Sequence, residues 1–186
     1  MQITLRSLIT LIHGMLFGGF FLMALFGAIA NLLRSRHESA DISPNLHRWD
    51  RAYLVTTVVL GWLAVLSGAY IVYPWYRAIA PAGAALTQYP QRLLLASPTT
   101  AGWHNFGMEW KEHVAWFAPI AMTAVAYIVI TYRNVWQANR QLRRSVITFA
   151  AAAFLAAAMA GTFGALINKA APVEGGRTIQ LIGETK

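Results

Sequence analysis

Two histidines next to or within apolar sequence are the residues best suited to chemistry in this chain. His13 lies inside an apolar run, and His113 lies near the end of the polar stretch GWHNFGMEWKEHVAWF, residues 102–117. Two neutral imidazoles on opposite faces of an iron form the axial ligands of haem b. We therefore predict that His13 and His113 bind one haem b between them. The alternative for His13 is a neutral imidazole that is hydrogen-bonded to a neighbouring backbone carbonyl.

The stretch 102–117 carries further candidate ligands on two faces of one helix. Glu109 and His113 are four residues apart and share a face, so we expect Glu109 to bond the ring nitrogen of His113 that a metal does not use. His104 lies nine residues before His113, on the opposite face, and is expected to serve the outer loop; it is kept as an alternative ligand. A metal ion bound directly by these His and Glu side chains ranks below haem, because the other apolar runs contain no Glu.

Glycines near the expected depth of His13 would give a haem the flat space it needs. The candidates are Gly14, Gly68, Gly161 and Gly164. The alternative is ordinary close packing of small residues between membrane helices, which the alanine-rich sequence around Gly161 favours. Lys169 follows the same run, and it is expected to pair with a haem propionate, pair with a glutamate, or extend to lipid head groups.

Four long apolar runs must position these side chains. They cover residues 7–33, 52–73, 114–132 and 145–168. A helix needs about 20 such residues to cross the hydrocarbon core of a bilayer. The predicted fold class is an all-α membrane protein with a single domain over 1–186: a four-transmembrane-helix up-down bundle with a long outer loop between helices 2 and 3. The first and third helices then lie diagonally across the core, which lets His13 and His113 converge. Ser97 followed by Pro98 predicts that the third helix begins well before its apolar run.

Composition excludes several classes of function. The chain is 57% hydrophobic and 12% charged, which is not the composition of an ordinary soluble domain. Its net charge of +8 comes from short basic clusters between apolar runs, so we expect contact with a lipid bilayer and not with nucleic acid. The absence of cysteine excludes disulfides, thiolate metal sites, iron–sulfur clusters and covalently attached haem. No complete catalytic motif predicts a stand-alone enzyme, so the chain is at most a subunit of a membrane oxidoreductase.

The arginines predict an orientation in the membrane. Eight of the 15 basic residues lie in the two shorter loops, and they are Arg34, Arg36, Arg48, Arg51, Arg133, Arg140, Arg143 and Arg144. Short loops that are rich in arginine stay in the cytoplasm. We therefore expect a multi-pass protein of a bacterial-type inner membrane, with both termini and residues 102–117 on the outer, periplasmic side. His37 and His47 would lie in a cytoplasmic loop, with a surface or loop-packing role.

With four spans and the pair His13 and His113, the chain resembles in a general way the four-helix b-type membrane cytochromes. These include the cytochrome b561-like proteins and the haem b membrane subunits of quinol-linked oxidoreductases. The resemblance implies an electron-transfer subunit with one haem b near the outer face. Such a subunit would pass electrons between a quinone pool and a partner redox protein, for example a periplasmic cytochrome, within a respiratory complex. Helices 2 and 4 contain no histidine, so a second transmembrane haem is not expected.

Two further interpretations stay open. In the first, the chain is a cofactor-free structural or accessory subunit of a larger membrane complex, and its aromatic and glycine-rich faces pack against partners. In the second, some of the aromatic side chains near the outer boundary line a quinone pocket, although most are expected to form an aromatic belt at the membrane interface.

Overall fold

The computed structural model describes residues 2–34 and 44–181, and nearly all of this part of the chain is helical. Four helices are long and apolar enough to cross a membrane, as the sequence predicted. These spans one to four are Leu5–Arg34, Arg48–Tyr76, Pro98–Thr131 and Arg140–Ala170. Each is longer than the apolar run within it, because helical structure continues into the polar sequence at its ends.

Spans one and two each change helix type along their length. Span one consists of α1 (Leu5–Leu11), the π-helix η1 (Ile12–Gly19) and α2 (Phe20–Arg34). Span two consists of α3 (Pro44–Ser67), the π-helix η2 (Gly68–Val72) and α4 (Tyr73–Tyr76). The π-helix is rare in proteins and is found mostly as single-turn insertions, frequently at functional sites. Both insertions are therefore candidate functional positions.

Span three begins where the sequence predicted a helix start. The Ser97 hydroxyl accepts a hydrogen bond from the Thr99 amide at 3.4 Å, and Pro98 occupies the first turn, so the predicted cap is confirmed. The span consists of α6 (Pro98–Gly102), η4 (Trp103–Met108), η5 (Trp110–Val114) and α7 (Phe117–Thr131). Both η4 and η5 are π-helical. The 3-10 helix η3 (Leu86–Gln88) and α5 (Pro90–Leu95) precede it.

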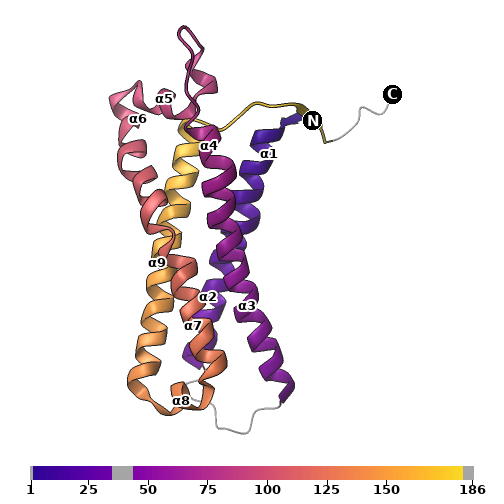
Figure 1. Ribbon diagram of the computed structural model, residues 1–186, viewed down its shortest axis with the longest axis vertical. Helices are drawn as coiled ribbons and strands as arrows, with labels where there is room; N and C mark the ends of the chain where they lie inside the picture. The colour runs from indigo at the N-terminus through magenta and orange to yellow at the C-terminus, as the bar shows by residue number, and fades with distance from the viewer. Residues whose placement is uncertain (1, 35–43, 182–186) are drawn as a thin grey trace.

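The remaining elements close the two ends of the bundle. The short α8 (Arg133–Ala138) turns the chain into α9 (Arg140–Ala170), and the Asn139 side chain caps α9 through bonds to two amides. At the opposite end β1 (Gln2–Thr4) pairs antiparallel with β2 (Thr178–Gln180). Figure 1 shows α8 at one end, called the α8 end below, and α4, α5 and α6 at the other, called the cap end.

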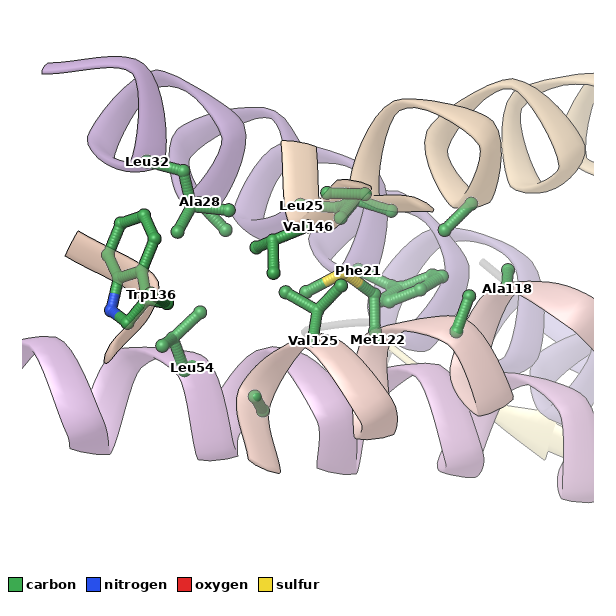
Figure 2. Close-up of a cluster of buried hydrophobic side chains, with 14 residues drawn as sticks. Phe21, Leu25, Ala28, Leu32, Leu54, Ala118, Met122, Val125, Trp136 and Val146 are labelled. Carbon is green, nitrogen blue, oxygen red and sulfur yellow. The ribbon is translucent and has the colours of Figure 1, made fainter. Parts of the chain in front are cut away.

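The spans lie side by side along the long axis, and each packs mainly against two others (Figure 1). α2 contacts α3 and α9, and α7 contacts the same two helices. The main core, toward the α8 end, includes Phe21, Leu25, Met122, Val125 and Val146, whose side chains converge in Figure 2. A separate cap cluster is formed by Tyr76, Leu94, Met108, Ile167, Ala171 and Val173. The bundle is thus held by two apolar clusters at different levels.

The main core leaves no room for a methyl group at Gly61. A Cβ atom there would lie 2.8 Å from Cε2 of Phe21, whose side chain is only 3% exposed. Gly61→Ala is therefore expected to lower the free energy of unfolding by about 1–3 kcal/mol, the usual cost of overpacking a core. Thermal unfolding in detergent measures the change. Gly14→Ala is the matched control, since no described atom lies within 4 Å of that Cβ position. Equal melting shifts for both variants would contradict the prediction.

Candidate functional site

His13 lies at the start of η1 and contacts the end of α3. Its Nδ1 atom is 3.0 Å from the Ser67 hydroxyl, and that hydroxyl is 3.2 Å from the Ala64 carbonyl. The Ser67 hydroxyl can donate to Nδ1 or accept from it, according to the tautomer of the imidazole, and the Ala64 carbonyl is a second partner of His13. The Nε2 atom of His13 makes no side-chain hydrogen bond with the described residues. It is the atom through which His13 can accept a hydrogen bond or bind a metal.

Gly68 provides the space in which the imidazole lies. A Cβ atom at residue 68 would be 2.7 Å from Cε1 of His13 and 3.3 Å from Nε2. The ring therefore packs directly against the backbone of span two, at the first residue of η2. Any larger residue at position 68 would displace the ring.

Lys111 reaches the same level from span three. Its Nζ atom lies 2.6 Å from the position of a Cβ atom at Gly164, and its charge acts on the His13 imidazole. The side chain is half-buried. Within the described part of the chain, no hydrogen bond or ion pair holds the ammonium group. An ammonium group without an acceptor in a membrane bundle is costly, and such residues often belong to binding sites or ion pathways.

These residues form one polar layer across the bundle, between the two apolar clusters. We call His13, Ser67, Gly68, Lys111 and Gly164 the polar layer. In span three Lys111 lies between Met108 of the cap cluster and Ala118 of the main core, and in span four Gly164 lies between Ile167 and Ala153. Three π-helical segments, η1, η2 and η5, contribute a residue to the layer. All four spans therefore meet at this level.

His113 lies on the outside of the bundle. Its side chain is 71% exposed, and its Nδ1 atom donates to the backbone carbonyl of Glu109 at 3.0 Å. The Glu109 carboxylate is 3.5 Å from the same nitrogen and is 54% exposed. Glu109 thus lies beside His113 on one face, whereas Lys111 on the opposite face points inward. His113 is thus exposed on the outside of the bundle, whereas His13 packs against span two.

The glycines proposed to line a haem space have different surroundings. The volumes beside Gly68 and Gly164 are filled by the side chains of His13 and Lys111. At Gly161 the nearest atom to a Cβ would be Leu22 Cδ1 at 3.6 Å, and Gly14 is exposed. The chain's own polar side chains therefore use the space that Gly68 and Gly164 leave.

His104 is buried under the connecting segment and is 9% exposed. Its Nδ1 atom is 2.6 Å from the Tyr76 hydroxyl, and its Nε2 atom is 3.3 Å from the Gln91 amide nitrogen of α5. Both ring nitrogens have partners, so His104 joins the cap end to span three and has no nitrogen free for a metal. His104 therefore lies on the buried face of span three, where it bonds to Tyr76 at the end of span two and to Gln91 of α5.

The other charged and polar candidates have separate positions. The Glu112 carboxylate is 3.8 Å from the Arg77 guanidinium, and Lys169 is exposed at the end of α9. His37 lies outside the described residues, and His47 lies on α3 with a side chain that is not described. Among the described residues, no group of three or more His, Cys, Asp or Glu side chains is placed to hold a metal ion.

Sequence reasoning assigned no role to Lys111. A lysine one turn outside an apolar run normally extends to lipid head groups, so its position alone drew no attention. The available signal was its spacing, because Lys111 lies seven residues after His104 and so shares a helix face with it. That face is buried at His104, Gly107 and Met108.

Comparison with known proteins gives no relative to argue from. No protein-family model matches the chain, and no curated protein or solved structure matches it either. The function therefore has to be argued from the polar layer itself. Its useful groups are Nε2 of His13, which makes no side-chain hydrogen bond with the described residues, and one cationic donor, Nζ of Lys111.

Proposed function

We propose that the polar layer binds the head group of a quinone, and that the protein is a membrane subunit passing electrons between a quinone pool and a partner redox protein. Quinone carbonyls accept hydrogen bonds, and the hydroxyls of the reduced form also donate them. Lys111 supplies a donor, and Nε2 of His13 supplies a second hydrogen-bonding atom, a donor or an acceptor according to its tautomer. The single observation that carries the proposal is the Lys111 ammonium group, which has no hydrogen-bond or ion-pair partner among the described residues.

The position of the polar layer favours a ligand that is soluble in lipid. The cap cluster lies on one side of the layer and the main core on the other. The flank of the bundle at this level is exposed, at Met15 and Leu16 of span one and at Tyr70 and Ile71 of span two. A quinone dissolved in the bilayer would reach the layer from the side.

The arginines support an orientation with the polar layer near the outer face. Arg133, Arg140, Arg143 and Arg144 all lie at the α8 end, on α8 or the first turn of α9. Arginine-rich ends of short loops stay in the cytoplasm of a bacterial-type inner membrane. The cap end, with β1 and β2, then faces the periplasm. A periplasmic cytochrome or another subunit of a respiratory complex is the partner that this orientation suits.

A titration in lipid nanodiscs tests the proposal. Short-chain ubiquinone and menaquinone are added to the purified protein, and binding is followed by quenching of tryptophan fluorescence, to which Trp110, next to Lys111, contributes. We expect saturable binding that His13→Ala weakens at least about fivefold, the effect of losing one hydrogen bond of about 1 kcal/mol. His113→Ala is the matched control and is expected to leave binding unchanged, because that side chain is exposed. Absence of saturable binding would sink the proposal.

Haem b is the second candidate ligand, and His13 alone provides the observation that favours it. Metal-binding imidazoles usually donate a hydrogen bond from their other ring nitrogen to a fixed partner, and Ser67, 3.0 Å from His13 Nδ1, is placed to be such a partner. A haem would supply one-electron transfer. The same preparations answer the question: a reduced-minus-oxidised b-type absorption band that is lost in both His13→Ala and His113→Ala would establish the shared haem. An iron-free, colourless protein that also binds no quinone would leave the structural accessory subunit.

A further inference from the structure

The short helix α8 is fixed to the bundle by one tryptophan. Trp136 is 3% exposed and belongs to the main core together with Leu32 and Leu54 (Figure 2). Asn134 and Ala138 lie two residues before and two residues after Trp136, which places them on the face of α8 opposite the buried indole. Both side chains are exposed. The outward face of α8 is therefore held in a fixed position.

An open hollow of about 630 Å³ lies at the corner between α8 and α9. It is lined by Asn134, Val135, Ala138 and Asn139. Its volume falls within the range of small-molecule sites, about 300–1,000 Å³. Two of the lining side chains are amides and two are aliphatic, so the hollow suits a ligand that carries both polar oxygen atoms and hydrocarbon.

The side-chain amide of Asn139 has donors left for such a ligand. Its Oδ1 atom accepts hydrogen bonds from the backbone amides of Gln141 and Leu142 at 2.9 and 3.0 Å. Its Nδ2 atom, which can only donate, has no partner within residues 2–34 and 44–181. The cap thus uses the first free amides of α9 and orients the side-chain nitrogen of Asn139 away from them. This nitrogen, and not the helix N-terminus, is the donor that the hollow offers.

Arginines flank the hollow on both sides in the sequence. Arg133 directly precedes the lining residues and Arg140 directly follows them, while Arg144 lies one turn after Arg140 on the same face of α9. None of the three forms a hydrogen bond or an ion pair with another residue that the structure describes. Residues 113–173 contain no Asp or Glu, and Asp50, at the same end on α3, is not paired with them. The ligand that fits this charge is an anion.

The level of the hollow along the bundle favours an anion that belongs to a lipid. Span three ends at Thr131 and span four begins at Arg140, so the hollow lies between the ends of two membrane-spanning helices. Tyr127 and Tyr132 are exposed just before it. Tyrosine is enriched at membrane–water interfaces, where the phosphates of the head groups lie.

We propose that the corner between α8 and α9 binds the phosphate-bearing head group of an anionic phospholipid. Arg140 and Arg144 pair with the phosphate, the Asn139 amide donates to a head-group oxygen, and Val135 contacts the hydrocarbon that follows. The site lies at the opposite end of the main core from the polar layer and does not depend on the proposed function.

Electron spin resonance of the full-length protein in phosphatidylcholine vesicles tests the proposal. Trace amounts of spin-labelled phosphatidylglycerol or phosphatidylcholine are added, and the motionally restricted fraction gives their relative association. We expect a preference of about fivefold for phosphatidylglycerol, equivalent to about 1 kcal/mol. Arg140→Gln combined with Arg144→Gln should reduce it below about twofold. Arg92→Gln combined with Arg177→Gln removes two exposed arginines outside the α8 end and is expected to leave the preference unchanged.

Val135→Trp separates a built site from a diffuse positive surface. The Val135 side chain is 53% exposed, so a larger residue fits without disturbing the core, and it fills the hollow while every charge is kept. We expect it to reduce the preference as the arginine pair does, whereas Val55→Trp, at a 50% exposed position of α3, should not. A wild-type protein without the preference, or a preference that survives Val135→Trp, would overturn the proposal. Displacement of the labelled lipid by millimolar inorganic phosphate would overturn the lipid as the ligand and assign the hollow to a soluble anion.

Discussion

Lys111→Met is expected to stabilise the protein and at the same time to weaken quinone binding about 10- to 100-fold. The ammonium group is half-buried and lacks a partner among the described residues, so an apolar side chain of similar length removes an uncompensated charge. The loss of binding follows from the loss of a charge-assisted hydrogen bond of about 1.5–3 kcal/mol. Thermal unfolding and fluorescence titration on the same preparation measure the two effects.

Lys169→Met is the matched control for this prediction. Lys169 lies toward the same end of the bundle, at the end of α9, but its side chain is exposed. Its replacement is expected to change neither the melting temperature nor the affinity by more than a surface substitution does, about 0.5 kcal/mol. A lower melting temperature for Lys111→Met would contradict an unpartnered ammonium group. Unchanged affinity would remove Lys111 from the binding site.

The four helices that are long and apolar enough to cross a membrane could be predicted from the sequence, because lipid imposes a simple condition. A span needs about 20 apolar residues, and the four uncharged runs satisfy or nearly satisfy that length. The early start of span three could also be predicted, because Ser97 and Pro98 are a local capping signal that needs no tertiary contact. The four π-helical segments could not be predicted, since no residue pattern in the chain distinguishes them from α-helix.

The candidate site was harder to predict than the fold. His13 could be identified because it is an ionisable residue inside an apolar run, where the membrane makes any such residue costly. The sequence predicted that the face of Glu109 and His113 points inward, and this was wrong, because the structure exposes those two side chains and buries the opposite face. Glu109 and His113 share one face, while His104 and Lys111 share the other. Packing against Tyr76, Gln91 and Gly164 places the second face inward, and those contacts are distant in sequence.

Gly68→Ala is expected to remove His13 from its position and to weaken quinone binding about tenfold. The added Cβ atom would lie 2.7 Å from Cε1 of the imidazole, a separation at which one of the two groups must move. The imidazole is the group that moves, since the Cβ atom is fixed to the helix backbone of η2. Its displacement breaks the bond to Ser67 and takes Nε2 away from the ligand. The His13 resonances in nitrogen-15 NMR and the quinone titration measure both consequences.

Gly164→Ala is the comparison variant. It shows whether the rigidity of the displaced side chain, and not crowding alone, determines the loss of affinity. A Cβ atom there would lie 2.6 Å from Lys111 Nζ, so the two substitutions create clashes of nearly equal closeness. The atom displaced at Gly164 is the end of a flexible side chain, which can rotate away and still reach a ligand. We therefore expect Gly164→Ala to cost less than threefold in affinity, below about 0.7 kcal/mol. Equal losses for the two variants would contradict the view that the layer combines a fixed imidazole with a mobile ammonium group. Gly68→Ala is the more damaging substitution because the imidazole is held between Ser67 and Gly68.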